Sequence, residues 1–330
     1  MMKIAQLGVG YWGPNLLRNL VNNPKCQVHS VVDLSPERRS FVEKTYPNIK
    51  VGSYSENVFD DKDIDAVVIA TPAKTHFQLA MKALESGKHV LVEKPMARSV
   101  KEVDQINNLS QKKGLVAMVG HTFLYNRCVQ FIKKLINEGE IGKVRYIYSQ
   151  RLNLGRIRQD VNALWNLAPH DVSIIQYLLN EPDYLKVAVH GISIVQKDIE
   201  DVAFLNITYP DNIMANIHVS WLDPQKVRRM TIVGSKKMVI YDDLADNKVA
   251  IYDKGIDKMA VLGKNMDFDQ GSPFMLTQRS GDVLLPKIDW QEPLGLQIDH
   301  FLNCILAEET CLTSAIHARR VIQILSDTHG

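Results

Sequence analysis

Short apolar runs alternate with amphipathic stretches through the first third of the chain. The runs are rich in β-branched residues and indicate buried strands at residues 4–7, 27–32, 65–71, 89–92 and 115–119. Between them, apolar residues recur at helical spacing, as Leu16, Leu17 and Leu20 do. This alternation predicts a doubly wound parallel sheet with right-handed crossovers.

Local signals mark where the intervening helices begin and end. Ser35 followed by Pro36 predicts an N-cap and a helix to about residue 46. A second helix covers about 75–86 and stops at Gly87. Ser99 with Glu102 forms a capping box that opens a helix to about residue 113.

The pattern changes at about residue 122. A helix is expected at 126–137 and another at about 169–179, and strands at 144–153, 185–195, 202–209, 212–221, 228–233, 237–241 and 248–252. We therefore expect a Rossmann-type α/β domain at 1–121 and an α+β domain at 122–330, whose C-terminal helix packs back on the first. A sheet with helices on one face needs cover on the other, which favours a homodimer or homotetramer.

Composition excludes several classes of function. The 330 residues are 45% apolar and 23% charged, and the net charge of +2 gives no bias toward nucleic acid or a membrane surface. No apolar run approaches the ~18 residues of a membrane span, and the chain enters a strand without a signal peptide. The scattered cysteines (Cys26, Cys128, Cys304, Cys311) indicate reduced thiols in a cytoplasmic protein, without a disulfide framework or a metal site.

The first strand leads into a glycine-rich turn. Gly8, Gly10 and Gly13 follow the G-x-G-x-x-G spacing of dinucleotide-binding turns. Gly8 permits the tight turn, Gly10 lets a pyrophosphate approach the backbone, and Gly13 lets the helix pack on the strand. With the helix N-terminus as a phosphate site, the turn is expected to bind a dinucleotide, and Tyr11 and Trp12 within it are counted as cofactor contacts.

Asp33 ends the second strand, about 20 residues beyond the turn. An acid at this place accepts hydrogen bonds from the adenosine ribose and repels a 2′-phosphate, which favours NAD over NADP. Arg38 and Arg39 keep NADP as an alternative, because an arginine can hold that phosphate. A solvated turn aspartate is the plainer interpretation.

Ligands of doubly wound sheets bind at the carboxyl ends of the strands. Three such ends are Thr71-Pro72, Glu93-Lys94-Pro95 and Gly120-His121. Lys94 is the informative residue, because partial burial lowers the pKa of a lysine toward the range useful for proton transfer. A solvent-exposed lysine near a turn is the alternative.

These motifs together resemble the glucose–fructose oxidoreductase/inositol dehydrogenase (Gfo/Idh/MocA) family. The resemblance rests on the glycine turn, on Ala70-Thr71-Pro72 with His76, on Glu93-Lys94-Pro95, and on the run from Glu292 to Ile305. It implies a Rossmann domain, a second domain with a large open mixed sheet, and NAD(P)-dependent chemistry on a sugar-like hydroxyl or ketone. It also implies that Lys94 lies near the nicotinamide, and that Thr71, Pro72, His76 and Glu93 contact the cofactor.

The family commonly carries an acid and a histidine four residues apart in the second domain. The histidine corresponds to His170, a candidate acid–base or hydroxyl-orienting group, but the acid position holds Asn166, which cannot take a proton. Pro169 suits a first helical turn, where the helix dipole would keep His170 neutral. The base is therefore Lys94 or His170, and an ordinary cap and a core histidine are the alternatives for Asn166 and His170.

The segment before this pair is basic and carries aromatic residues that could stack on a base or sugar. Its candidate substrate-binding residues are Arg151, Asn153, Arg156, Arg158 and Trp165, with Tyr148 nearby. A solvated loop of charges is the plainer interpretation. The segment resembles family members that oxidise the 3-hydroxyl of UDP-N-acetylglucosamine-type sugars.

The sequence therefore predicts an NAD-dependent sugar 3-dehydrogenase acting on a nucleotide sugar. One alternative is a dehydrogenase of a free polyol or sugar such as inositol. An alternative of another class is a catalytically silent NAD-binding regulator.

Overall fold

The computed structural model describes residues 1–155, 157–159, 161–260 and 274–327. Contacts divide the chain into two compact units. Within the described residues, the first unit holds 1–127, 172–177 and 290–327, and the second holds 128–171 and 178–289. No helix in these ranges is long and apolar enough to cross a membrane.

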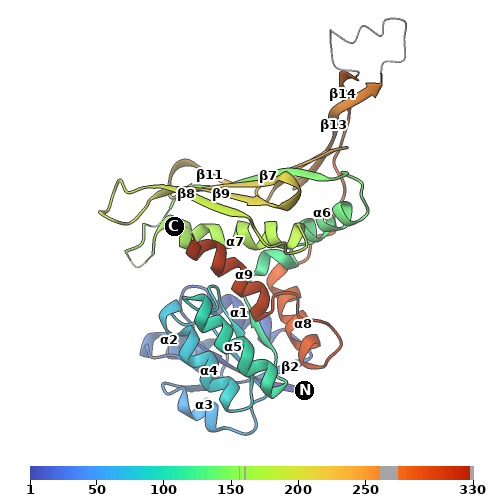
Figure 1. The fold of residues 1–330 in the computed structure, drawn as a ribbon. Coiled ribbons are helices and arrows are strands. Elements are labelled where there is room, and N and C mark those ends of the chain that lie inside the picture. The colour runs from blue at the N-terminus through green and yellow to red at the C-terminus, as the bar shows by residue number, and fades with distance from the viewer. Residues whose placement is uncertain (156, 160, 261–273, 328–330) are drawn as a thin grey trace, which may run out of the picture. The chain divides into compact units, whose positions relative to one another are not determined.

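The first unit, whose helices are labelled in Figure 1, is built on a parallel sheet of six strands in the order β3-β2-β1-β4-β5-β6. This is the Rossmann strand order, in which the order reverses between β1 and β4. The predicted doubly wound sheet is thus confirmed. Its strands are β1 (Met2–Leu7), β2 (Cys26–Val32), β3 (Lys50–Gly52), β4 (Ala66–Ile69), β5 (His89–Val92) and β6 (Ala117–Val119).

Two helices of this unit begin where the sequence places their caps. The hydroxyl oxygens of Ser35 and Ser99 accept hydrogen bonds from the backbone N–H groups of Arg38 and Glu102, both at 3.3 Å. The helices are α1 (Gly13–Val21), α2 (Pro36–Thr45), α3 (Glu56–Asp60), α4 (His76–Glu85) and α5 (Val100–Lys113), with the 3-10 turns η1 (Ala73–Thr75) and η2 (Thr122–Tyr125).

Two C-terminal helices, α8 (Pro293–Ile305) and α9 (Ala315–Ser326), also belong to the first unit. Helix α9 packs along α5, where Arg319 pairs with Asp104 at 2.8 Å. The segment before α9 lies beside β6, because the Val119 N–H donates to the Thr313 carbonyl at 2.8 Å. Contacts therefore group 290–327 with the first unit. The expected second domain ran from 122 to 330, with its C-terminal helix packing back on the first domain.

The second unit carries a mixed sheet of eight strands in the order β14-β13-β12-β11-β7-β10-β9-β8. Strand β10 pairs in parallel with β7, and the other neighbours are antiparallel. It holds α6 (Arg127–Asn137) except for its first residue, and the part of α7 (Ala163–Leu178) that lies outside residues 172–177. Its strands are β7 (Val144–Leu154), β8 (Lys186–Ile192), β9 (Val202–Tyr209), β10 (Ile213–Ser220), β11 (Leu222–Gly234), β12 (Met238–Asp242), β13 (Val249–Ala260) and β14 (Phe274–Leu284).

The two faces of this sheet differ in character. Along β7, the side chains of Ile147, Ser149 and Arg151 are buried, whereas those of Tyr146 and Tyr148 are exposed. This alternation follows from the two-residue period of a strand. The buried face supplies the core of the unit, and the opposite face keeps exposed aromatic side chains.

Candidate active site

The three glycines of the turn between β1 and α1 meet different surroundings. A Cβ atom on Gly8, whose φ is +91°, would lie 2.6 Å from the Ala70 carbonyl oxygen. One on Gly13 would lie 2.5 Å from the Gly8 carbonyl oxygen, whereas one on Gly10 would meet nothing within 4 Å. Gly8 and Gly13 are therefore required by packing, and Gly10 leaves open space against the backbone. This arrangement fits a pyrophosphate that approaches at Gly10.

Gln6 holds the turn from inside the sheet. Its side chain is fully buried, and its amide nitrogen donates to the carbonyl oxygens of Gly8 and Gly13, both at 2.9 Å. Sequence reasoning missed this residue. The available signal was a polar side chain within a buried parallel strand, which needs hydrogen-bond partners.

Asp33 connects the end of β2 to the same turn. One carboxylate oxygen accepts from the Val9 N–H at 2.7 Å, and the other from the Ser35 N–H at 2.8 Å. A carboxylate offers about four acceptor positions, so the partly exposed group can also accept from ribose hydroxyls. The guanidinium of Arg39 donates to the carbonyl oxygens of Asp33 and Leu34, which engages it with backbone, while Arg38 is exposed.

The aromatic residues of the turn have different environments. Tyr11 is almost fully exposed, and Trp12 is partly exposed just before α1. The Trp12 side chain hydrogen-bonds to Glu93 at the end of β5. Of the two, Trp12 therefore has a defined place at the strand ends, and cofactor contact by either remains a prediction.

His76 links the loops that follow β4 and β5. It is buried, and its ring nitrogens lie 2.8 Å from the carbonyl oxygens of Thr71 and Pro95. Burial lowers the pKa of His76, although these carbonyl groups favour its charged form. The Thr71 hydroxyl lies 2.7 Å from that of Thr75, which leaves Thr71 and Pro72 at the rim of the sheet. Both ring nitrogens of His76 thus face protein atoms, and direct cofactor contact by His76 remains a prediction.

Lys94 follows β5 directly, beside an unusual carboxyl group. Burial raises the pKa of Glu93 to about 7, although the Lys94 charge, the Lys94 N–H and Trp12 favour ionisation. The Lys94 N–H donates to the Glu93 carboxylate at 3.2 Å. A Cβ atom on Gly120 would lie 3.0 Å from this carboxylate, so glycine there makes room for it.

His121 adds a second titratable group at these strand ends. It is buried after β6, and its ring centroid lies 5.0 Å from that of His317 on α9. Burial, with the charges of His317 and Lys94, lowers the pKa of His121 well below its usual value. His121 is therefore held neutral beside Lys94. The sequence marked Gly120-His121 as a strand end lining the ligand crevice, but it gave His121 no role of its own.

In the second unit, Asn166 and His170 lie on α7, and the predicted start of this helix was wrong. Helix α7 begins at Ala163, because Asn162 caps it by accepting from the Trp165 N–H at 2.9 Å. Asn166 and His170 share one side of the helix, as expected. His170 lies about two turns inside, however, where the helix dipole has little effect. The dipole argument for a neutral His170 therefore does not hold.

The residues predicted to bind the substrate differ in their surroundings. Arg151 is buried and makes a bidentate ion pair with Asp171, at 2.6 and 3.2 Å. Arg228, which sequence reasoning missed, donates to the Asn153 side chain at 2.8 Å, and burial lowers the pKa of Arg228 to about 10. A role of Arg151 in binding a substrate phosphate thereby loses its support.

The remaining predicted residues lie near the start of α7. Arg158 is exposed, and its carbonyl oxygen accepts from the Gln196 side chain at 2.8 Å. Trp165 is half-buried in the first turn of α7. Arg156 lies outside the described residues. Tyr148 lies on the exposed face of β7 and Arg151 on the buried face, so the two side chains do not share a binding surface.

A Rossmann strand order, a glycine turn open at Gly10 and an acid at the end of β2 define an NAD-binding oxidoreductase domain. The chain belongs to the GFO/IDH/MocA family. Residues 2–121 match its model of an oxidoreductase family with an NAD-binding Rossmann fold, and residues 129–240 match a model of its C-terminal domain.

Similar proteins include enzymes with different substrates. UDP-N-acetylglucosamine 3-dehydrogenase of Acidithiobacillus ferrooxidans is 28% identical over 261 residues, covering 79% of this chain and 76% of that protein. Its solved structure superposes with a TM-score of 0.80 at 24% identity, over 99% of this chain and 97% of that chain. The NAD-dependent scyllo-inositol 2-dehydrogenase of Bacillus subtilis is 25% identical over 332 residues, covering 96% of this chain and 90% of that protein.

A third relative carries out a different kind of reaction. The 2,7-anhydro-N-acetylneuraminate hydratase of Mediterraneibacter gnavus is 28% identical over 223 residues, and the match spans 63% of this chain and only 58% of that protein. Membership of the family therefore leaves the substrate and the net reaction open.

Proposed function

We propose that the protein oxidises the 3-hydroxyl of a UDP-N-acetylglucosamine-type sugar with NAD. The observation that carries this proposal is the place of Lys94, directly after β5 and beside Glu93, to which Trp12 of the glycine turn is hydrogen-bonded. Lys94 thus follows a strand that ends at the same edge of the sheet as the glycine turn. Bound NAD supplies the hydride acceptor, and the protein supplies orientation and proton transfer.

The roles of the side chains follow from their chemistry. Lys94 or His170 takes the proton of the reacting hydroxyl, and the Asn166 amide orients the sugar because it can both donate and accept hydrogen bonds. The neutral His121 avoids adding a positive charge beside Lys94. Glu93, whose pKa is raised to about 7, offers a neighbouring group that holds or releases a proton near neutral pH.

The nucleotide sugar is favoured by the relative that acts on UDP-N-acetylglucosamine and by the residues around the start of α7. Arg158 is exposed for a phosphate, and Trp165 is half-buried and available for stacking. Arg151 takes no part, because it is held by Asp171.

The direct experiment follows NADH absorbance after the protein is mixed with NAD and UDP-N-acetylglucosamine. Turnover is expected, and Lys94→Ala should reduce kcat at least about 100-fold while leaving the Kd for NAD nearly unchanged. The exposed Lys101→Ala on α5 is the matched control and should behave as wild type. Unchanged turnover in Lys94→Ala would remove Lys94 from the mechanism.

A second candidate is the oxidation of a free polyol, favoured by the inositol dehydrogenase that matches 96% of this chain. Arg158→Ala separates the two substrates. It should raise KM for a nucleotide sugar and leave KM for inositol unchanged. Turnover with inositol alone would establish this candidate, and tight NAD binding without reduction across both substrate classes would indicate a silent regulator.

The exposed face of the second sheet supports a further part of the proposal, that two copies associate through it. Tyr146 stacks with Tyr148 at 6.2 Å between ring centroids, and Phe204 stacks with His218 at 4.2 Å. Met214 of β10 is paired with Tyr146 in the sheet. Adjacent strands thus present aromatic and apolar side chains on one face, and this face suits a second copy.

A further inference from the structure

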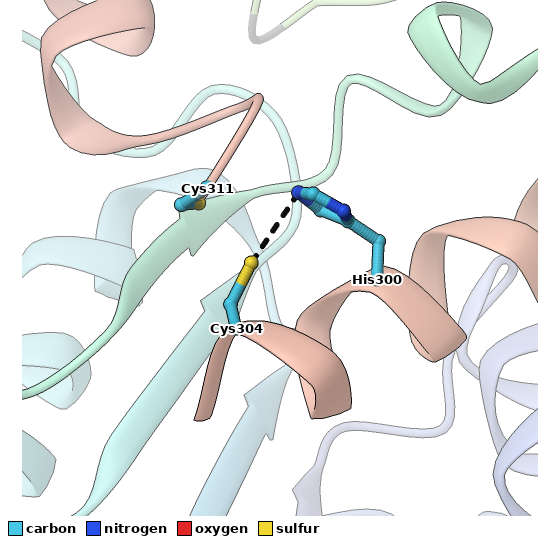
Figure 2. A group of neighbouring side chains, drawn as sticks. All are labelled: His300, Cys304 and Cys311. Carbon is cyan, nitrogen blue, oxygen red and sulfur yellow. Dashed lines mark hydrogen bonds between the residues drawn. The ribbon is translucent and has the colours of Figure 1, made fainter. Parts of the chain in front are cut away.

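Two cysteines and a histidine converge at the end of α8. The ring of His300 and the sulfur atoms of Cys304 and Cys311 lie within 4.8 Å of one another (Figure 2). His300 and Cys304 are one helical turn apart on α8, and Cys311 comes from the loop that follows. The sequence suggested scattered thiols, because Cys304 and Cys311 are not in a C-x-x-C motif.

The orientation of His300 is fixed from both sides of its ring. The Leu312 N–H donates to Nε2 at 2.9 Å, so Nε2 is an acceptor and the proton resides on Nδ1. Nδ1 faces a carboxylate oxygen of Glu309. The other oxygen of Glu309 accepts from the Asn303 amide at 2.7 Å, which holds the carboxylate in place.

Cys304 therefore has a base at its sulfur atom. His300 Nε2 lies 3.3 Å from Cys304 Sγ, and Glu309 orients the imidazole. A nucleophile, a base and a group that orients the base form the arrangement that activates thiols. The hydrogen bond from the Cys311 thiol and that of His300 lower the pKa of Cys304 to about 6, against burial. The same contact raises the pKa of Cys311.

We infer that Cys304 and Cys311 form a redox-active dithiol that hydroperoxides convert reversibly to a disulfide. The Cys304 thiolate attacks a peroxide oxygen and the O–O bond breaks, so that Cys304 becomes a sulfenic acid. The departing hydroxide takes up the proton that the Cys304 thiol released and leaves as water. Cys311 then attacks the Cys304 sulfur, the S–O bond breaks, and water leaves with the Cys311 proton. Two thiols lose two electrons, and one hydrogen peroxide becomes two waters.

The surroundings permit this change. Cys304 is buried, but Cys311 is partly exposed and residues 306–310 of the loop are exposed, so the loop can yield to a peroxide and to the shorter S–S contact. The loop continues into Thr313, whose carbonyl oxygen accepts from Val119 of β6 and whose hydroxyl lies 2.9 Å from that of Tyr125. A disulfide would therefore tie α8 to the segment that lies beside β6.

A zinc ion is the competing occupant of this cluster. Histidine and cysteine side chains are zinc ligands, and a carboxylate on the far nitrogen is a common supporting contact. The cluster, however, offers three ligands where closed structural zinc sites use four. The dithiol is the better account, and zinc is an outcome of the test.

The test begins with the zinc content of the purified, reduced protein, followed by one equivalent of hydrogen peroxide, alkylation and peptide mass spectrometry. The expected result is a cross-linked Cys304–Cys311 peptide, lighter by two hydrogens and restored by dithiothreitol. Cys26 and Cys128 are internal controls, because burial raises the pKa of both thiols, and they should remain alkylatable. Equal oxidation of all the cysteines, or one tightly held zinc per chain, would overturn the inference.

Variants separate the attacking thiol from the resolving thiol. Cys311→Ser should stop at a Cys304 sulfenic acid that dimedone traps, and Cys304→Ser should leave Cys311 reduced. Glu309→Gln should move the pH profile of Cys304 alkylation up by about one unit, since it weakens the base. The titratable groups that face the pair are His300, Glu309 and Tyr125, with Lys25 acting on Glu309. An unchanged profile would exclude this role of His300 and Glu309.

Discussion

At the scale of single residues, burial makes the ionised form of Glu93 energetically unfavourable. A carboxyl group whose pKa is raised by burial favours its neutral form, yet it lies beside the lysine proposed as the base. The ionised form is therefore disfavoured in the folded protein and tolerated because Lys94 and Trp12 contact it. Such perturbed groups cluster at functional sites, because acid–base work needs a pKa near the working pH.

The raised pKa has a defined effect on stability. Because the pKa of Glu93 is about 7 when folded and about 4.3 when unfolded, its stabilising contribution is complete below the unfolded value and is lost as the pH rises through 7. Glu93→Gln keeps a neutral group at every pH. We expect it to raise the free energy of unfolding by about 1–3 kcal/mol at pH 8 and to change it little near pH 4.5.

Urea unfolding of both proteins at the two pH values measures this difference. The exposed Glu85→Gln on α4 is the control, and it should give the same small change at both pH values. A Glu93→Gln protein that is less stable than wild type at pH 8 would contradict the assigned cause.

Single residues also show what sequence reasoning can and cannot find. Gly8, Asp33 and Lys94 were identified because a spacing or a strand end fixes their place in a Rossmann unit. Gln6 and the pairing of Arg151 with Asp171 were missed, because hydrogen-bond partners depend on which strands and helices meet. The approach of Cys311 to Cys304 depends on the path of a loop, which carries no periodic signal.

At the scale of elements, the glycine turn makes a paired prediction. In Gly13→Ala the new methyl group meets the Gly8 carbonyl oxygen at 2.5 Å, so the start of α1 must move away from the turn. We expect a loss of about 1–3 kcal/mol in the free energy of unfolding. Gly10→Ala meets nothing within 4 Å and should change stability by less than about 0.5 kcal/mol.

NAD affinity distinguishes the packing role of Gly13 from the role of Gly10 in admitting the pyrophosphate. Gly10→Ala places a methyl group where the pyrophosphate is expected to approach, so it should weaken NAD binding at least about tenfold in a fluorescence titration. If Gly10→Ala binds NAD as wild type does, the cofactor does not approach the backbone there. A stable Gly13→Ala protein would show that α1 can move without cost.

The buried ion pair between β7 and α7 makes a third prediction. Asp171→Ala would leave the Arg151 charge buried without its carboxylate, at an expected cost of about 3–5 kcal/mol in urea unfolding. Replacing both residues, as Arg151→Met with Asp171→Leu, removes the charge as well and should recover most of this loss. If the double variant were as unstable as Asp171→Ala, the loss of stability would not come from an unpaired buried charge on Arg151.

Helix α7 shows why element boundaries resist prediction. Pro169 was placed in a first turn because proline is favoured there, but it lies inside a continuous helix that Asn162 caps. Because Pro169 has no N–H, the carbonyl oxygen of Trp165 lacks the usual helical hydrogen bond from position 169. Trp165 directly precedes Asn166 in the helix. Strand β3 and helix α3 were missed because they are too short to show a period.

At the scale of the whole molecule, the second sheet has one face on which large aromatic side chains are exposed in the single chain. Tyr148 is 38% exposed in the middle of β7, and its neighbours in the sheet are Asn216 on β10 and Thr231 on β11. A large aromatic side chain with this exposure favours burial against a partner. In a symmetric dimer, each copy presents the same face to the other, so a single substitution acts twice.

Tyr148→Glu therefore tests the proposed association in full. A charge introduced twice into one interface should weaken the dimer by at least about 100-fold in Kd, which amounts to about 2.7 kcal/mol. Light scattering during gel filtration should show wild type as a dimer or tetramer and the variant as a smaller species. Tyr54→Glu, at an exposed position of the first unit, is the control and should leave the mass unchanged. A monomeric wild type, or a variant with the wild-type mass, would mean that this face is covered by something other than a second copy.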